Sequence, residues 1–177
     1  MTQSCGSCMQ DPENLFTLRG LEDTCRDQGL LDEALIFWER YIRGRPRDIF
    51  VLTRIADGYK TIDNLESAKE YYHRALNINN GDSYALMGLA DMYHKAGHDE
   101  QAILYYGQVL EKNPGMINIL TILGNLHRRL GTLEAARGYF EQALALDKDN
   151  TYALYGMGHY YRWQRDYPKA ISCWEKV

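Results

Sequence analysis

Residues of the same kind recur every 34 positions along the chain, and this period is the strongest constraint on its fold. A small side chain marks one position of the repeat: Ala34, Ala68, Ala102, Ala136 and Ala170. A large aromatic side chain follows four residues later: Trp38, Tyr72, Tyr106, Phe140 and Trp174. An aliphatic side chain marks a third position: Leu21, Ile55, Leu89, Leu123 and Met157. Such a period is typical of stacked helical repeats, in which each unit packs mainly on its neighbours.

Each repeat is predicted to be a hairpin of two amphipathic helices. In residues 83–116 the apolar residues of the first helix follow the i, i+3, i+4, i+7 spacing: Leu86, Leu89, Ala90 and Tyr93. Gly97 is expected to end that helix, Asp99 to cap the second helix, and Pro114 to stop it. Three residues at the turns between repeats are expected to cap the helix that follows: Asp48, Asp82 and Asn150.

The repeats carry the marks of a known family. Its small-residue position holds Ala56, Ala90, Gly124 and Gly158, and its tyrosine position holds Tyr59, Tyr93 and Tyr161. The chain departs from the pattern at Glu22, Cys25 and His127. Over residues 15–177 it resembles the tetratricopeptide repeats. The resemblance implies an all-α fold, a right-handed superhelical solenoid of antiparallel helix hairpins.

The resemblance also implies how the chain is organised. Five units are expected: 15–48, 49–82, 83–116, 117–150 and 151–177. Residues 1–14 have little apolar periodicity, and we expect them to form a flexible N-terminal tail. The fifth unit stops about seven residues short of a full period. It is therefore expected either to continue in a longer array or to present an uncapped end to another copy of the chain.

Charge and hydropathy argue against two classes of partner. The net charge of −4 disfavours general binding to nucleic acid, which requires a basic surface. No apolar run is long enough to span a bilayer, and residues 1–10 lack the basic and apolar regions of a signal peptide. We therefore expect a cytoplasmic protein that binds neither nucleic acid nor membranes.

No arrangement of residues predicts catalysis or a bound metal. Cys5 and Cys8 form a CxxC pair, but neither a strand nor a second pair of ligands accompanies it, so two free thiols are the simpler interpretation. His94 and His98 have the spacing of metal ligands, yet Gly97 between them is expected to end the helix. We therefore predict a protein that is not an enzyme and holds no cofactor or metal.

In tetratricopeptide repeats the first helix of each unit lines a concave groove. The residues at the groove positions are Phe16, Arg19, Asp23, Phe50, Arg54, Asp57, Tyr84, Met87, Asp91, Asn125, Arg128, Tyr152, Tyr155 and His159. The second position of the units is mostly aromatic, and the ninth is acidic in the first three units. The twelfth position is mostly basic: Arg26, Lys60, His94, Arg128 and Arg162.

These rows predict a protein-interaction scaffold or adaptor. Asp23, Asp57 and Asp91 would bind basic residues of an extended or helical peptide or partner domain, and the aromatic residues would supply apolar contact. Two plainer interpretations stay open: the charges form a solvated face with i, i+3 pairing, and the aromatic residues pack between hairpins. The alternative function is a self-assembling structural protein that oligomerises through the groove or the uncapped end, at Ile171, Trp174 and Val177.

Overall fold

The computed structural model describes residues 31–177, and all the regular structure in that part of the chain is helical. The helices are α2 (Leu31–Gly44), α3 (Ile49–Thr61), α4 (Leu65–Ile78), α5 (Ser83–Lys95), α6 (Asp99–Lys112), α7 (Ile117–Arg129), α8 (Leu133–Leu146), α9 (Thr151–Trp163) and α10 (Tyr167–Trp174). The first helices of the described hairpins begin at Ile49, Ser83, Ile117 and Thr151, each 34 residues after the last. The all-α fold of helix hairpins is confirmed.

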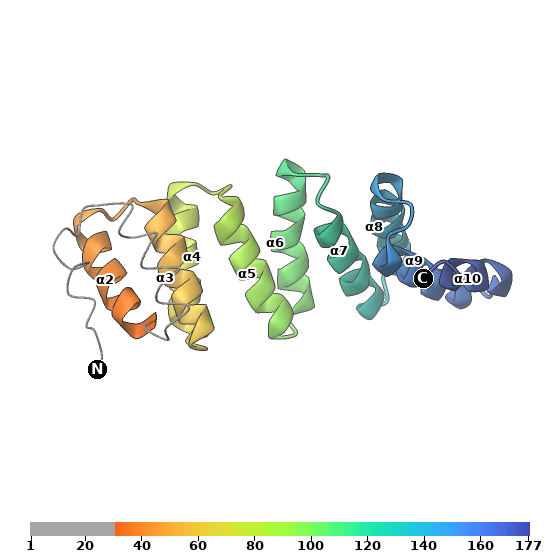
Figure 1. The fold of residues 1–177 in the computed structure, drawn as a ribbon, viewed down its shortest axis with the longest axis horizontal. Helices are drawn as coiled ribbons and strands as arrows, with labels where there is room; N and C mark the ends of the chain where they lie inside the picture. The colour runs from red at the N-terminus through yellow and green to blue at the C-terminus, as the bar shows by residue number, and fades with distance from the viewer. Residues whose placement is uncertain (1–30) are drawn as a thin grey trace, which may run out of the picture. The chain divides into compact units, whose positions relative to one another are not determined.

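The chain divides into two compact units, Met1–Gly88 and Leu89–Val177. In the described part of the first unit, α2 packs on α3 and α3 packs on α4 (Figure 1). Its core contains the side chains at the small, aliphatic and aromatic repeat positions, together with Leu35 and Leu52. All are nearly inaccessible to solvent: Ala34, Leu35, Trp38, Leu52, Ile55, Ala68 and Tyr72. The periodic residues of the sequence are therefore core residues.

The second unit is built in the same way. Each helix from α6 to α10 packs on the next one, and α7 also contacts α9 (Figure 1). One core cluster joins α7, α8 and α9: Leu120, Ala136, Phe140, Ala143, Ala153, Met157 and Tyr160. α7 and α9, which contact each other directly, are the first helices of two successive repeats.

The turns inside the hairpins share one conformation. Gly97 has φ +77° and Gly131 has φ +76°, in the left-handed region expected after a helix. The same position of the other repeats holds Asp63 with φ 62° and Arg165 with φ 63°. The hairpin therefore imposes this conformation even where a side chain makes it costly.

The predicted helix caps between repeats are confirmed. Asp48 accepts a hydrogen bond from the Val51 N–H at 3.2 Å, and Asp82 accepts one from the Ala85 N–H at 2.9 Å. Asn150 accepts one from the Ala153 N–H at 3.1 Å. Each side chain thus satisfies a backbone donor that the first turn of a helix leaves without an intrahelical partner.

The predicted cap at Asp99 is wrong. α6 begins at Asp99 itself, and the cap position is His98, whose side chain makes no capping bond. The Asp99 carboxylate instead accepts a hydrogen bond from Arg129 Nε at 2.9 Å, which links α6 to α7. An interaction between distant residues has taken the side chain that the local pattern assigned to the cap.

No helix among residues 31–177 combines the length and the hydropathy needed to cross a membrane.

Candidate functional site

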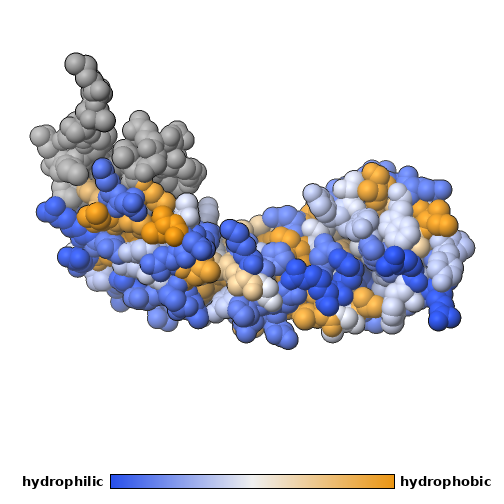
Figure 2. Space-filling model, turned by 90° about the horizontal axis from the view of Figure 1, so that it is seen from below, coloured by the Kyte–Doolittle hydropathy of each residue, from blue (hydrophilic) through white to orange (hydrophobic). Residues whose placement is uncertain are grey.

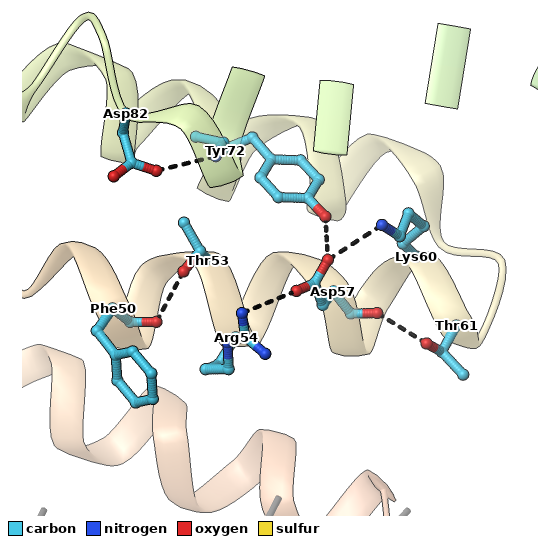
Figure 3. Close-up of polar contacts among 9 residues, drawn as sticks. Phe50, Thr53, Arg54, Asp57, Lys60, Thr61, Tyr72 and Asp82 are labelled. Atoms are coloured by element: carbon cyan, nitrogen blue, oxygen red, sulfur yellow. Dashed lines mark hydrogen bonds and ion pairs between the residues drawn. The ribbon is translucent and has the colours of Figure 1, made fainter. Parts of the chain in front are cut away.

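The ninth repeat position is occupied by Asp57 in α3 of the first unit. Its carboxylate accepts a hydrogen bond from the Tyr72 hydroxyl of α4 (Figure 3). Lys60 Nζ lies 3.0 Å from one carboxylate oxygen, and Arg54 lies 3.5 Å from the other. Both oxygens of Asp57 are thus engaged within the hairpin. The i, i+3 pairing that the sequence left open is present here.

The close packing of Tyr72 explains why its hydroxyl ends at Asp57. The side chain is 1% exposed, and its ring lies against Gly88 of α5. A Cβ atom at Gly88 would overlap the ring, so glycine is required for this approach. The buried hydroxyl needs an acceptor, because an unpaired polar group in a protein interior is costly. Asp57 supplies that acceptor.

The second unit repeats this pair once. Asp91 in α5 accepts a hydrogen bond from the Tyr106 hydroxyl of α6 at 2.6 Å. Burial and this bond raise the pKa of Tyr106 well above its usual value, so the phenol stays protonated. Tyr106 is 1% exposed, whereas Asp91 is an exposed residue. The carboxylate therefore satisfies a core hydroxyl and still reaches the surface.

The later repeats change both members of the pair. Asn125 of α7 corresponds to Phe140, which has no hydroxyl, and Asn125 instead accepts a 3.4 Å hydrogen bond from Arg128 Nε. His159 of α9 corresponds to Trp174, with the two rings edge to face and their centroids 5.7 Å apart. In the four described first helices, α3, α5, α7 and α9, the aspartate therefore accompanies a core tyrosine and is replaced where the core residue is Phe140 or Trp174.

The aromatic row at the second position is largely open to solvent. Tyr84 is 71% exposed and Tyr152 is 72% exposed. Phe50 is half-buried, with the Arg54 guanidinium 5.5 Å from its ring centroid, and Met87 is also half-buried. Tyr84 and Tyr152 therefore do not pack between hairpins, which removes that interpretation for these two residues.

In the second unit, residues of α7 and α9 form what we call the α7–α9 face: Asn125, Arg128, Tyr152, Tyr155, His159 and Arg162. Tyr155 is 51% exposed, and its ring meets the His159 ring edge to face at 4.6 Å. Burial, and then the charges of Arg128 and Arg162, lower the pKa of His159. Arg162 stands at the twelfth position, in the predicted basic row, and its charge acts on His159.

The residues of the predicted self-association end differ in their surroundings. Ile171 is exposed on α10, but the half-buried Trp174 lies against Gly158 of α9 and donates from Nε1 to the Tyr155 carbonyl at 3.4 Å. α10 ends at Trp174, so Val177 lies beyond the helix. The helical spacing predicted for these three residues therefore does not extend to Val177, and Trp174 packs on α9.

The described residues contain no group of three His, Cys, Asp or Glu side chains able to hold a metal ion. α5 ends at Lys95, so His98 lies outside the helix that carries His94. Several predicted features lie outside the described residues: Phe16, Arg19, Asp23, the CxxC pair Cys5 and Cys8, and the 1–14 tail.

Comparison with known families decides what kind of repeat this is. The family model described as the TT21 fifth ARM repeats domain matches residues 82–177, more than half of the chain. The chain belongs to this family. A tetratricopeptide repeat model matches residues 51–82, so the resemblance stated from the sequence is confirmed. No curated protein matches the chain significantly in sequence.

Solved structures share the fold of this family member at low sequence identity. The crystal structure of MamA is 17% identical, with a TM-score of 0.78 over 88% of this chain and 91% of that one. YrrB, described as a TPR protein with an unusual peptide-binding site, is 17% identical, with a TM-score of 0.77 over 96% and 88%. A tetratricopeptide repeat protein from Parabacteroides merdae ATCC 43184 is 21% identical, with a TM-score of 0.77 over 88% and 62%. These likenesses establish the fold, and function has to be argued from the side chains.

Proposed function

We propose that the chain is a non-catalytic protein-interaction scaffold that binds a peptide or partner domain on the first helices of its repeats. One observation carries this proposal: Tyr84 and Tyr152 occupy the same repeat position and are each more than two-thirds exposed. Tyrosine gives a large contact area for a small loss of conformational freedom, which suits it to interfaces. Repeat arrays commonly use such surfaces for binding.

The chemistry of the described residues is consistent with binding rather than catalysis. The strongest pKa shifts belong to tyrosines whose hydroxyls donate to carboxylates, namely Tyr59 to Glu39 and Tyr106 to Asp91. Burial and hydrogen bonding keep these phenols protonated, which is the opposite of an activated nucleophile. YrrB, with the same fold, is described as having a peptide-binding site, which supports a peptide as the ligand class.

Of the two described aspartates that the sequence assigned to binding basic residues, we retain one. Asp57 already binds Tyr72, Lys60 and Arg54, so it is a poor site for a partner's basic residue. Asp91 is the described aspartate suited to that role, because it is exposed and its hydrogen bond with Tyr106 uses Oδ1. We assign the contact with a basic residue to Asp91.

A peptide-binding assay with matched variants tests the proposal. Peptides selected from a random displayed library on the full chain would be titrated against the parent and against Tyr84→Ala/Tyr152→Ala. Loss of an exposed aromatic anchor should weaken binding about tenfold. The matched control is Leu104→Ala/Leu146→Ala, which removes side chains that are 57% and 54% exposed on second helices and should leave affinity unchanged. Equal effects of the two variants would contradict the proposal.

Self-association is the second candidate function, and the exposed Tyr167 and Ile171 of α10 are the observation in its favour. Ile36 and Leu104 are at least as exposed as Ile171, so exposure alone does not single out α10. In the face shown in Figure 2, apolar residues toward the C-terminal end form separate spots among hydrophilic ones. Light scattering over a concentration series, on the parent and on Ile171→Glu, would detect an oligomer that depends on α10. A constant monomer mass would exclude it.

A further inference from the structure

The α7–α9 face differs from the other first helices in its charge. Neither α7, INILTILGNLHRR, nor α9, TYALYGMGHYYRW, contains an aspartate or glutamate. Both contain arginine and histidine. α3 carries Asp57 and α5 carries Asp91 at the position that His159 occupies in α9. Two successive first helices of the second unit are therefore free of acidic residues.

The two arginines of this face form no ion pair with a carboxylate of residues 31–177. Arg128 donates to the Asn125 side-chain oxygen, a neutral group, at 3.4 Å. Four acidic residues of the neighbouring helices pair with other cations: Asp99 with Arg129, Glu134 and Glu141 with Arg137, and Asp166 with Lys169. Arg128 and Arg162 are in no ion pair of the described chain.

The geometry brings these charges and the exposed tyrosines together. Tyr152, Tyr155, His159 and Arg162 follow one another at spacings of three and four along α9, so they lie on one side of that helix. α7 contacts α9 directly, and the charge of Arg128 reaches His159. The result is a surface with two guanidinium groups, an imidazole and two tyrosines.

Building on the proposed function, we infer that the α7–α9 face binds an acidic peptide segment of the partner, with Arg128 and Arg162 pairing with its carboxylates. Guanidinium groups bind carboxylates through paired N–H donors, and Tyr152 and Tyr155 would contact the apolar side chains next to them. A nucleic acid is the weaker candidate, because tight binding of a phosphate backbone requires many cations and the net charge of the chain is −4. An acidic peptide needs only the local charge complementarity seen here.

Library selection on the full chain tests this inference. A random displayed peptide library would be selected on the parent and on Arg128→Gln/Arg162→Gln. The matched control is Arg43→Gln/Arg47→Gln, which makes the same change in net charge at two exposed arginines of the first unit. We expect Asp and Glu to be enriched in peptides selected on the parent and on the control, and not on the α7–α9 variant.

A direct titration then measures the effect. A selected acidic peptide should bind the parent and the control equally, and should bind Arg128→Gln/Arg162→Gln about tenfold more weakly. The same peptide with Gln in place of each Glu should bind the parent weakly. Its affinity should fall little further on Arg128→Gln/Arg162→Gln. Circular dichroism would show that each variant is folded.

The outcomes separate this inference from the proposed function. Selected peptides without acidic enrichment, or with the same enrichment on the α7–α9 variant, would overturn the inference and leave the scaffold proposal standing. Failure to select any peptide would count against both. Binding of a single-stranded RNA oligonucleotide at physiological salt, lost in the same variant, would overturn the acidic peptide in favour of a phosphate backbone.

Discussion

The first helices α3 and α9, one in each unit, use the same repeat position in different ways. Asp57 of α3 is bound by Tyr72, Lys60 and Arg54, so that its charge is used within the hairpin. His159 of α9 meets Trp174, and the arginine charges around it remain unpaired within the described chain. The core explains the difference: a buried tyrosine hydroxyl requires an acceptor, whereas phenylalanine and tryptophan at that position do not require a carboxylate. The described aspartates of this row therefore serve partly to satisfy buried tyrosine hydroxyls. Because α9 packs on a tryptophan, it needs no aspartate at this position and carries His159 there.

Both regions share a glycine that packs closely against a core aromatic ring, and substitution of this glycine should have the largest effect on stability. Gly88→Ala in the first unit and Gly156→Ala in the second each place a methyl group inside an aromatic ring, that of Tyr72 or Phe140. Overpacking a rigid core should lower the free energy of unfolding by about 3 kcal/mol in each case. Thermal and urea unfolding would measure it.

The matched control for this prediction is Gly107→Ala or Gly138→Ala. Both glycines lie inside helices, and a Cβ atom there meets no other group within 4 Å. Alanine should stabilise these helices by up to about 1 kcal/mol. If all four substitutions acted alike, close packing of the ring would not be the reason for Gly88 and Gly156.

Removing the acceptor should distinguish the repeats. Asp91→Ala leaves the buried Tyr106 hydroxyl without its partner and should cost about 2 kcal/mol. Asn125→Ala lies opposite Phe140 and should change stability by less than about 0.5 kcal/mol. When Tyr106 is already changed to Phe, the further change Asp91→Ala should lower the free energy of unfolding by much less. Chemical denaturation of the four variants would test this, and a full cost in that background would contradict the role of Asp91 as an acceptor.

Binding to the α7–α9 face should depend on pH through His159. Burial, Arg128 and Arg162 lower its pKa, so the imidazole is neutral in the free protein near pH 7. The two neighbouring rings, Tyr155 on α9 and Trp174 on α10, are uncharged at this pH. A bound carboxylate raises the pKa, so binding takes up a proton. Affinity for the acidic peptide should therefore rise as pH falls from 7 toward 5.5, by at most about tenfold per pH unit.

Calorimetric titrations at several pH values would measure this linkage. His159→Gln should bind with an affinity that is nearly independent of pH over the same range. Because the lowered pKa also makes the folded state less favourable below the usual histidine pKa, circular dichroism at pH 5.5 must show an intact fold. Equal pH dependence of the parent and the variant would exclude His159 as the titrating group.

The ion pair of Lys60 with Asp57 should matter least. Lys60→Ala removes a partially exposed cation, while Tyr72 and Arg54 continue to bind the carboxylate. The free energy of unfolding should change by less than about 0.5 kcal/mol, with a smaller effect at high salt. Thermal unfolding at two salt concentrations would measure it; a larger loss would mean that Lys60, rather than Tyr72, holds Asp57 in place.

Local interactions made much of this fold predictable. The caps at Asp48, Asp82 and Asn150 join groups three residues apart, and the turn at Gly97 depends on the backbone of a single residue. Such features can be read from neighbouring letters of the sequence. The predicted Asp99 cap was wrong because Arg129, thirty residues later, binds that side chain.

By itself, the sequence determined the helix hairpins, their period and their core residues, because the 34-residue repetition of small, aliphatic and aromatic side chains can be buried in only one regular way. The tertiary structure decided which charges on the first helices are free. Tyr72 reaches Asp57 and Tyr106 reaches Asp91 across fifteen residues and two helices. Arg128 acts on His159 from another repeat. Spacing along one helix shows which side chains are neighbours on that helix, but pairing between helices depends on how closely they pack.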